Sequence, residues 1–285
     1  MDRKTFLKLT AGTTLGWTAY LAACREPDGL DLPAGQRVLP AIGLQLYTIR
    51  QMMSGDMRGA LQATADVGYS EVEFAGYHNQ TPSQVRALLD EFALDPVAAH
   101  IDIADLRSDP GGVFAAAETV GHRYLIVPWL AEDQRTAEGY LQFAEELNRI
   151  GEQCRGAGFT LGYHNHAFEF DVVDQSRGRG FNILLDETDP ELVVFEMDVY
   201  WAVYGGVEPP AYFRNWPGRF PLCHVKDMGL NREMVDVGQG NMQWGNIFDD
   251  AKTGGVEHFF VEHDTPSDWR TTIQRSHDYL AALTF

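Results

Sequence analysis

From Ile42 to the C-terminus, the sequence alternates regularly between short apolar segments and longer helical patterns. Strict alternation of strand and helix predicts a parallel sheet, because each strand must return across the sheet through a helix. Eight strands in about 245 residues favour one closed (β/α)8 barrel, an α/β fold that needs roughly 250 residues. The expected strands are Ile42–Tyr47, Glu71–Phe74, Val97–His100, Tyr124–Pro128, Phe159–His164, Leu192–Met197, Pro221–Val225 and His258–Glu262.

The segments between these strands have the features of helices. Thr81-Pro82 places a capping hydroxyl before a proline at a first helical position. Residues Ala137–Ala157 carry their apolar side chains on one stripe, and Trp269–Leu283 forms a last helix. The alternative, a doubly wound open sheet, requires a Gly-rich phosphate-binding turn after the first strand. Gly43-Leu44-Gln45-Leu46-Tyr47 is no such turn, so we expect a single barrel over residues 41–285.

The first 24 residues have a different character. Three basic residues precede a mildly apolar stretch that ends in Leu21-Ala22-Ala23-Cys24. This resembles a bacterial lipoprotein signal, in which Cys24 is lipidated, and the stretch is too short for a permanent membrane helix. We expect export to the periplasm, a membrane contact only through that lipid, and a tether over residues 25–40. An N-terminal helix of a cytoplasmic protein is the alternative. Lys4 stands where a twin-arginine signal has its second arginine, which leaves the export route open.

The charge balance excludes some partners. The chain has 41 acidic and 22 basic residues and a formal net charge of −19. Generic nucleic-acid binding depends on Lys and Arg, so a nucleic-acid partner is not expected. Cys154 and Cys223 show no metal-type spacing, and we expect both to be small buried side chains.

Polar residues gather at the ends of the expected strands, where a (β/α)8 barrel carries its chemistry. Six of the nine histidines lie there, whereas His122 and His277 are expected on helix surfaces. Three carboxylates and one imidazole from four successive strands suit one divalent cation, with Mn²⁺ the best fit and Mg²⁺, Co²⁺ or Zn²⁺ as alternatives. The expected ligands are Glu169, Asp198, His224 and Glu262.

Five motifs together resemble the xylose isomerase-like TIM-barrel superfamily of sugar isomerases and epimerases, over about Ile42 to Leu283. They are Gly43-Leu44-Gln45-Leu46-Tyr47-Thr48, Gly162-Tyr163-His164-Asn165-His166-Ala167-Phe168-Glu169-Phe170, Asp198-Val199-Tyr200-Trp201, Cys223-His224-Val225-Lys226-Asp227 and Val261-Glu262-His263-Asp264. The resemblance implies the same four metal ligands, a small sugar substrate and, as is common there, a homo-oligomer. Many epimerases have the first glutamate at the end of strand five, where this chain has His164. Relatives with Tyr-His-Asn-His include inosose dehydratase-like enzymes and lyases of 3-keto-glycosides.

The chemistry implied is removal of a proton next to a carbonyl, with a metal-stabilised enediolate. His164 or His166 is the expected base, since histidine titrates near neutrality, and Glu262 is the other candidate. In the epimerases two metal-bound glutamates act on opposite faces, here Glu169 and Glu262. Lys226 holds a substrate oxygen or pairs with Asp198 or Asp227. The expected substrate-binding residues are Gln45, His100, Trp129 and Trp201.

We therefore expect a sugar isomerase or epimerase, with a 3-keto-glycoside lyase or inosose dehydratase-like enzyme as the alternative. A non-catalytic carbohydrate-binding lipoprotein is a minor alternative, because a protein that only binds carbohydrate does not need four ligands for a metal ion. The superfamily also contains metal-dependent endonucleases, but those use more ligands and a basic groove. A phosphorylated sugar is not expected, because Gly238-Gln239-Gly240 reads as a turn rather than a phosphate site.

Overall fold

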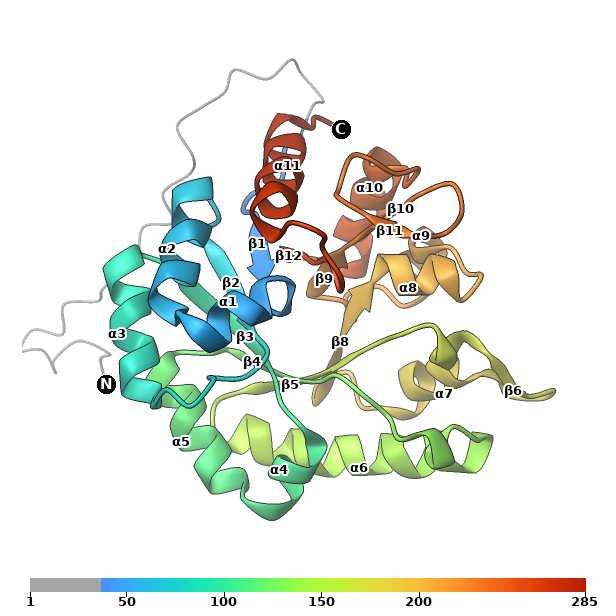
Figure 1. Ribbon diagram of the computed structural model, residues 1–285. Helices are drawn as coiled ribbons and strands as arrows, with labels where there is room; N and C mark the ends of the chain where they lie inside the picture. Colours follow the sequence, from blue (N-terminus) through green and yellow to red (C-terminus); the bar gives the residue numbers. More distant parts are fainter. Residues whose placement is uncertain (1–36) are drawn as a thin grey trace, which may run out of the picture.

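The structure is a computed structural model that describes residues 37–285, and its core is a closed barrel of eight parallel strands (Figure 1). The strands follow one another around the barrel in the order β1-β12-β9-β8-β5-β4-β3-β2, and β2 closes it by pairing with β1. The predicted (β/α)8 fold is confirmed. The barrel strands are β1 (Gly43–Gln45), β2 (Glu71–Phe74), β3 (Asp95–His100), β4 (Tyr124–Val127), β5 (Thr160–His164), β8 (Val193–Asp198), β9 (Leu222–Val225) and β12 (His258–Val261).

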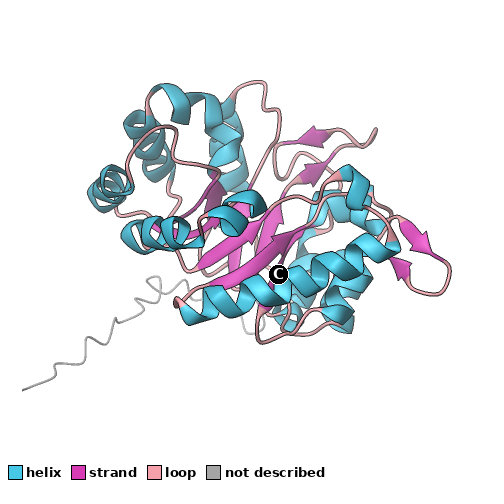
Figure 2. Cartoon of the chain, turned by 90° about the horizontal axis from the view of Figure 1, so that it is seen from below, coloured by secondary structure: helices cyan, strands magenta, loops and turns pink. Residues whose placement is uncertain are grey.

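Helices surround the strands, as the view from below shows (Figure 2). Thr81 caps α3 through the predicted hydroxyl, and Gln84 completes a capping box. The longer helices are α2 (Met57–Val67), α3 (Pro82–Phe92), α5 (Pro110–Val120), α6 (Ala137–Gly156), α7 (Gly180–Glu187), α9 (Pro209–Asn215), α10 (Trp244–Gly254) and α11 (Trp269–Ala282). The shorter ones are α1 (Arg50–Gly55), α4 (Ile103–Ser108), α8 (Val199–Tyr204) and the 3-10 turns η1 (Leu46–Ile49), η2 (Glu132–Gln134) and η3 (Phe168–Phe170).

Two small antiparallel ribbons lie outside the barrel. One pairs β6 (Val172–Asp174) with β7 (Gly178–Arg179), and it projects from the edge of the molecule in both views (Figures 1 and 2). The other pairs β10 (Asp227–Met228) with β11 (Met234–Val235). The second ribbon follows β9 directly, so it belongs to the end of the barrel where a catalytic site is expected.

The barrel interior has an apolar layer made by alternate residues of the strands. Ile126, Leu222 and Phe260 belong to one buried cluster there. Two strands contribute glycine at this level: a Cβ added to Gly43 would collide with the ring of Phe260, and one added to Gly162 would collide with Ile126. The interior is therefore filled by side chains, and the next inward position begins a polar layer on seven of the eight strands, β4 with Pro128 being the exception.

The described chain begins beside its C-terminal end. The backbone N–H of Arg37 donates to the carbonyl of Phe285 at 2.7 Å, and Phe285 donates back at 3.0 Å. Leu39 is buried, so the last residues of the expected tether pack on the barrel. The expected signal at residues 1–24 and the tether up to residue 36 lie outside the described residues. Within residues 37–285, no helix is both long and apolar enough to cross a membrane.

Two predictions on single residues have opposite outcomes. Cys154 and Cys223 are buried free thiols, as expected. The prediction that His122 lies on a helix surface is wrong: it is buried after the end of α5. Its Nδ1 lies 2.8 Å from the carbonyl of Pro96 and its Nε2 lies 2.9 Å from the hydroxyl of Tyr77.

Candidate active site

The carboxyl-terminal end of the barrel holds a buried layer of ionisable side chains. Side chains alternate between the two faces of β9. Those that point into the barrel are apolar Leu222, then His224, and then Lys226 just after the strand. Seven strands or the loops just after them contribute to the layer, so the closed barrel brings together residues far apart in the sequence. The layer consists of Gln45, Glu73, His100, His164, Glu196, Asp198, His224, Lys226 and Glu262.

Three of the four expected metal ligands lie together. Asp198, His224 and Glu262 each offer one ligand atom, and these atoms lie within 4.8 Å of one another. Nδ1 of His224 is 2.7 Å from Oε2 of Glu262 and 3.9 Å from Oδ2 of Asp198. Nε2 of His164 also lies 3.9 Å from that aspartate oxygen. The group therefore presents two carboxylates and two imidazoles to one small region.

Lys226 adds a positive charge to this group. Its buried Nζ lies 2.6 Å from Oε2 of Glu262, 2.9 Å from Oδ2 of Asp198 and 2.8 Å from Oδ1 of Asp264. The expected alternative partner, Asp227, takes no part, since its oxygens accept hydrogen bonds from the loop that follows β9. Lys226 thus pairs with three carboxylates, two of which belong to the expected ligand set.

Several buried atoms of this group have no hydrogen-bond partner of suitable geometry: Oδ2 of Asp198, Nδ1 of His224 and Oε2 of Glu262. Their ion-pair distances are short, but the angles are not those of hydrogen bonds. Buried polar atoms are nearly always satisfied in folded proteins. Two carboxylate oxygens and an imidazole nitrogen that converge in this way fit a bound cation, which would take the place of the proton on that nitrogen.

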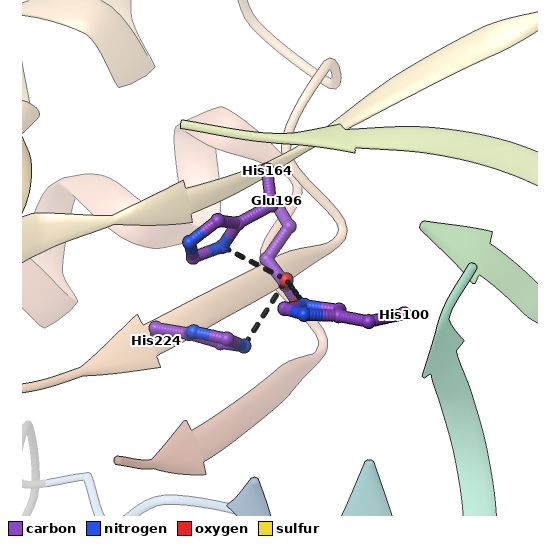
Figure 3. Close-up of side chains that lie close together, drawn as sticks. All are labelled: His100, His164, Glu196 and His224. Atoms are coloured by element: carbon purple, nitrogen blue, oxygen red, sulfur yellow. Dashed lines mark hydrogen bonds and ion pairs between the residues drawn. The ribbon is translucent and has the colours of Figure 1, made fainter. Parts of the chain in front are cut away.

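A second carboxylate lies deeper in the barrel and connects three imidazoles (Figure 3). Oε2 of Glu196 is 3.0 Å from Nε2 of His100, 3.1 Å from Nδ1 of His164 and 3.1 Å from Nε2 of His224. Each of these four residues offers one potential ligand atom, and the four atoms lie within 4.8 Å of one another, so this group too could hold a metal ion. Beside them, Glu73 accepts a 2.6 Å hydrogen bond from Nε2 of Gln45 and lies 2.6 Å from Nε2 of His224.

Charge and burial set the protonation of the layer. Burial raises the pKa of Asp198 to about 6, although Lys226 and His224 act in the opposite direction. Burial alone would also raise the pKa of Glu262, but Lys226 and His224 outweigh it and hold that pKa well below its usual range. For His224, burial is outweighed by Glu196 and Glu262, which raise its pKa well above the usual value. Carboxylates therefore face both cationic partners and other carboxylates within the layer.

Glu169 does not join the other three expected ligands, and this expectation is corrected. Its Oε1 accepts a 2.7 Å hydrogen bond from the hydroxyl of Tyr163, and its Oε2 accepts one of 2.9 Å from the backbone N–H of His166. Tyr163 precedes inward-pointing His164 on β5, so it points outward, where its ring contacts Phe143 of α6. The turn η3 therefore places the carboxylate of Glu169 on the outer side of β5, away from the other three expected ligands. Among the described residues, His164 stands where the resemblance would place the first glutamate.

A cavity of about 510 Å³ opens above this layer. Trp129, 50% exposed, and Tyr47, 41% exposed, present aromatic surfaces at its mouth. The ring of His166 packs edge-on against Trp129, with ring centres 5.0 Å apart. The lining includes His100, Trp129, His164, His166, Lys226 and Glu262, all of which the sequence had singled out.

Two expected substrate-binding residues do not line this cavity. Gln45 is buried and donates its amide to Glu73. The backbone N–H of Trp201 donates to Asp198 at the start of α8, and the indole ring lies 6.0 Å from Nζ of Lys226. Both support charged residues of the site rather than facing the cavity.

Glu73 and Glu196 are the functional candidates that sequence analysis missed or left without a role. Glu196 stands in an otherwise apolar strand, two residues before Asp198. Because side chains alternate along a strand, this spacing places both on the same inward face. A charged residue inside an apolar strand was the signal that could have identified it.

Comparison with known proteins agrees with the barrel fold. Residues 61–283 match the family described as xylose isomerase-like TIM barrel. The chain belongs to this family. A solved sugar phosphate isomerase/epimerase from Parabacteroides distasonis is similar to it, with a TM-score of 0.75 and 26% identity, over 85% of this chain and 98% of that one.

Two further proteins are similar to the chain. An inosose dehydratase of Geobacillus kaustophilus is 25% identical over 207 residues, 62% of this chain and 65% of that enzyme. The matched region therefore spans less than two thirds of that relative. The IOLI protein, solved with a bound zinc atom, shares the fold with a TM-score of 0.66 and 13% identity, over 84% of this chain and 95% of that one.

Proposed function

We propose that this chain is a divalent-metal-dependent enzyme that removes a proton next to the carbonyl of an uncharged keto-sugar or related polyol ketone. Return of the proton to the opposite face or to the neighbouring carbon makes it an epimerase or isomerase. The observation that carries the proposal is the convergence of Asp198, His224 and Glu262 beneath an open cavity, with buried atoms that lack hydrogen-bond partners.

The residues present fit a divalent cation. Asp198, His224 and Glu262 would hold it, and Nε2 of His164 is the nearest further donor, 3.9 Å from Oδ2 of Asp198. Two carboxylates and two imidazoles suit Mn²⁺, Co²⁺ or Zn²⁺, and zinc is the metal in the IOLI structure. When bound, such an ion acts as a Lewis acid that polarises the substrate carbonyl.

The remaining side chains supply the proton transfer. Glu262 reaches the cavity from the end of β12, and His164 and His166 reach it from β5, three strands around the barrel. Burial lowers the pKa of His166 to about 3 and that of His164 well below its usual value, so both rings are neutral and able to accept a proton. A carboxylate and a neutral imidazole on two sides of a substrate would allow removal from one face and return to another.

Charge favours an uncharged substrate. Among residues 37–285, Lys226 is the only Lys or Arg that lines the cavity, and three carboxylates already pair with it. The backbone N–H groups of Gly238 and Gly240 would be needed to bind a phosphate group in this loop. They donate to the Asp227 carboxylate, so they are not available for an anion. The aromatic surfaces of Trp129 and Tyr47 are typical of contacts with the apolar faces of sugars.

Elimination of a β-substituent is the second candidate. The two-glutamate mechanism of the epimerases needs a second carboxylate in the cavity, whereas both oxygens of Glu169 are occupied behind β5. The Geobacillus relative is an inosose dehydratase. Elimination would remove the same proton and then release water or the glycosidic oxygen. It would need a base on only one face of the substrate.

Proton exchange in deuterated water tests both candidates. Purified protein with Mn²⁺, Co²⁺ or Zn²⁺ is incubated with ketoses, inososes and 3-keto-glycosides, and the products are followed by NMR. We expect deuterium at the carbon next to the carbonyl. Isomerisation or epimerisation should leave the number of carbon and oxygen atoms unchanged, whereas elimination should release water or the aglycone.

The variants make the exchange test specific. His224→Ala should abolish the exchange, whereas His277→Gln, altered on α11 away from the cavity, should retain it. Absence of exchange and elimination with every substrate and metal, in protein that is folded and metal-loaded, would contradict the proposal.

A further inference from the structure

Glu196 is a buried carboxylate in contact with three imidazoles, and the polar cavity above it does not reach it. Its Oε2 lies 3.0 Å from Nε2 of His100 and 3.1 Å from both Nδ1 of His164 and Nε2 of His224 (Figure 3). A carboxyl group accepts hydrogen bonds and has at most one O–H of its own to donate. An oxygen that meets three ring nitrogens is therefore served by ring N–H donors, and Nδ1 is the nitrogen that His164 turns toward it.

This requirement fixes which nitrogen of His164 is free. Nδ1 of His164 lies 3.1 Å from Oε2 of Glu196, while its Nε2 faces Oδ2 of Asp198 at 3.9 Å. The ring is only 2% exposed, and burial disfavours the charged imidazolium, so we expect it to carry a single proton. If that proton lies on Nδ1, Nε2 presents a lone pair toward Asp198 and the cavity.

We propose that Glu196 is a positioning residue that holds His164 as the Nδ1–H tautomer and so turns the lone pair of Nε2 toward the site. The inference rests on the proposed function, because a lone pair at this place serves as a metal ligand or as a base. Hydrogen bonds to the second nitrogen commonly fix the tautomer and orientation of such histidines.

Glu73 provides the matching contact on the other side of the cluster. Its Oε2 lies 2.6 Å from Nε2 of His224 and accepts a second 2.6 Å hydrogen bond from Gln45. Nδ1 of His224 then faces Glu262 at 2.7 Å. Glu73 has no hydrogen bond or ion pair with His164, so it serves as a matched control for Glu196.

Nitrogen NMR on protein freed of metal by chelation measures the tautomer directly. Two-bond ¹H–¹⁵N spectra of ¹⁵N-histidine-labelled protein distinguish protonated from unprotonated ring nitrogens, and the signals missing from His164→Gln identify this ring. We expect His164 to be the Nδ1–H tautomer in the wild type and in Glu73→Gln. In Glu196→Gln, the side-chain amide can donate to Nδ1, and we expect the Nε2–H tautomer.

The same variant should affect function in a way that loss of packing alone would not. We expect kcat to fall by about 10²–10⁴-fold with little change in KM, as for other wrong-tautomer histidines. Metal affinity should weaken by about 10–100-fold. Glu196→Asp, which restores an acceptor on a shorter side chain, should recover part of both.

Several results would overturn the inference. An Nε2–H tautomer of His164 in the wild type would do so without any variant, even if Glu196→Gln failed to fold. An unchanged tautomer in folded Glu196→Gln would do the same. A metal-shifted Nδ1 signal after Zn²⁺ addition would make Glu196 a co-ligand with His100, His164 and His224 instead. The tautomer is read without substrate or metal, so failure of the proposed reaction remains a separate outcome.

Discussion

At the scale of single residues, a side chain at the end of a barrel strand is placed by the strand itself, whereas a side chain in a loop is placed by the tertiary contacts of that loop. Asp198 and His224 lie in the last two residues of β8 and β9, and Glu262 directly follows β12, so strand prediction alone brings them together. Glu169 comes five residues after the end of β5, and the path of the intervening turn is set by the Tyr163 hydroxyl and the His166 amide that hold its carboxylate. These tertiary contacts leave no pattern in the sequence.

His122 illustrates the same limit and leads to a prediction on pH. Burial lowers its pKa to about 4, whereas an unfolded histidine has a pKa near 6.5. Between pH 4 and pH 6.5, His122 therefore binds a proton in the unfolded chain but not in the folded chain. The stability associated with neutral His122 is therefore complete above pH 6.5 and is lost as the pH falls toward 4, by about 3 kcal/mol in total.

Urea unfolding at pH 7, 6 and 5 tests this for the wild type and His122→Gln. Glutamine cannot take up the proton, so we expect the stability of the variant to decline less steeply below pH 6.5. At pH 7 it should be the less stable protein, because it loses ring contacts to Phe74 and Tyr77. Parallel declines in the two proteins would show that His122 does not titrate in this way.

At the scale of elements, strands and helices are predicted to within a few residues, but the loop after β9 is not. Asp227 is buried, and its carboxylate organises this loop by accepting five hydrogen bonds. The donors are the backbone N–H groups of Met228, Gly238, Gly240 and Met242 and the indole N–H of Trp244. From the sequence this aspartate is expected only as an alternative partner of Lys226, whereas the structure gives it a role in folding the loop.

Asp227→Ala should therefore leave several buried N–H groups without a partner and destabilise the protein by about 3 kcal/mol or more. Asp236→Asn is a control in the same loop, since Asp236 makes a 3.4 Å ion pair with exposed Arg275 and should cost little. Urea unfolding measures the stability, and limited proteolysis should show early cleavage between residues 228 and 243 in Asp227→Ala alone. Equal stability of the two variants would contradict this role of Asp227.

At the scale of the whole molecule, the barrel holds an excess of buried carboxylates at one end, within a chain of formal net charge −19. Glu73, Glu196, Asp198 and Glu262 share this end with one lysine and the surrounding imidazoles. Like charges in a confined site disfavour the folded state, and a cation that binds only the folded chain offsets this cost. The protein should therefore be markedly more stable with metal than without it.

Thermal unfolding with and without Mn²⁺ or Zn²⁺ tests this relation. At a free metal concentration 100 times the dissociation constant, binding adds about 2.7 kcal/mol, which corresponds to roughly 5–10 °C in a barrel of this size. Asp198→Asn should lose most of this increase, yet should unfold at a higher temperature than the metal-free wild type because one buried carboxylate is gone. Glu169→Gln should keep the full increase, since its carboxylate lies behind β5. Loss of the increase in Glu169→Gln but not in Asp198→Asn would return Glu169 to the ligand set and exclude the arrangement described above.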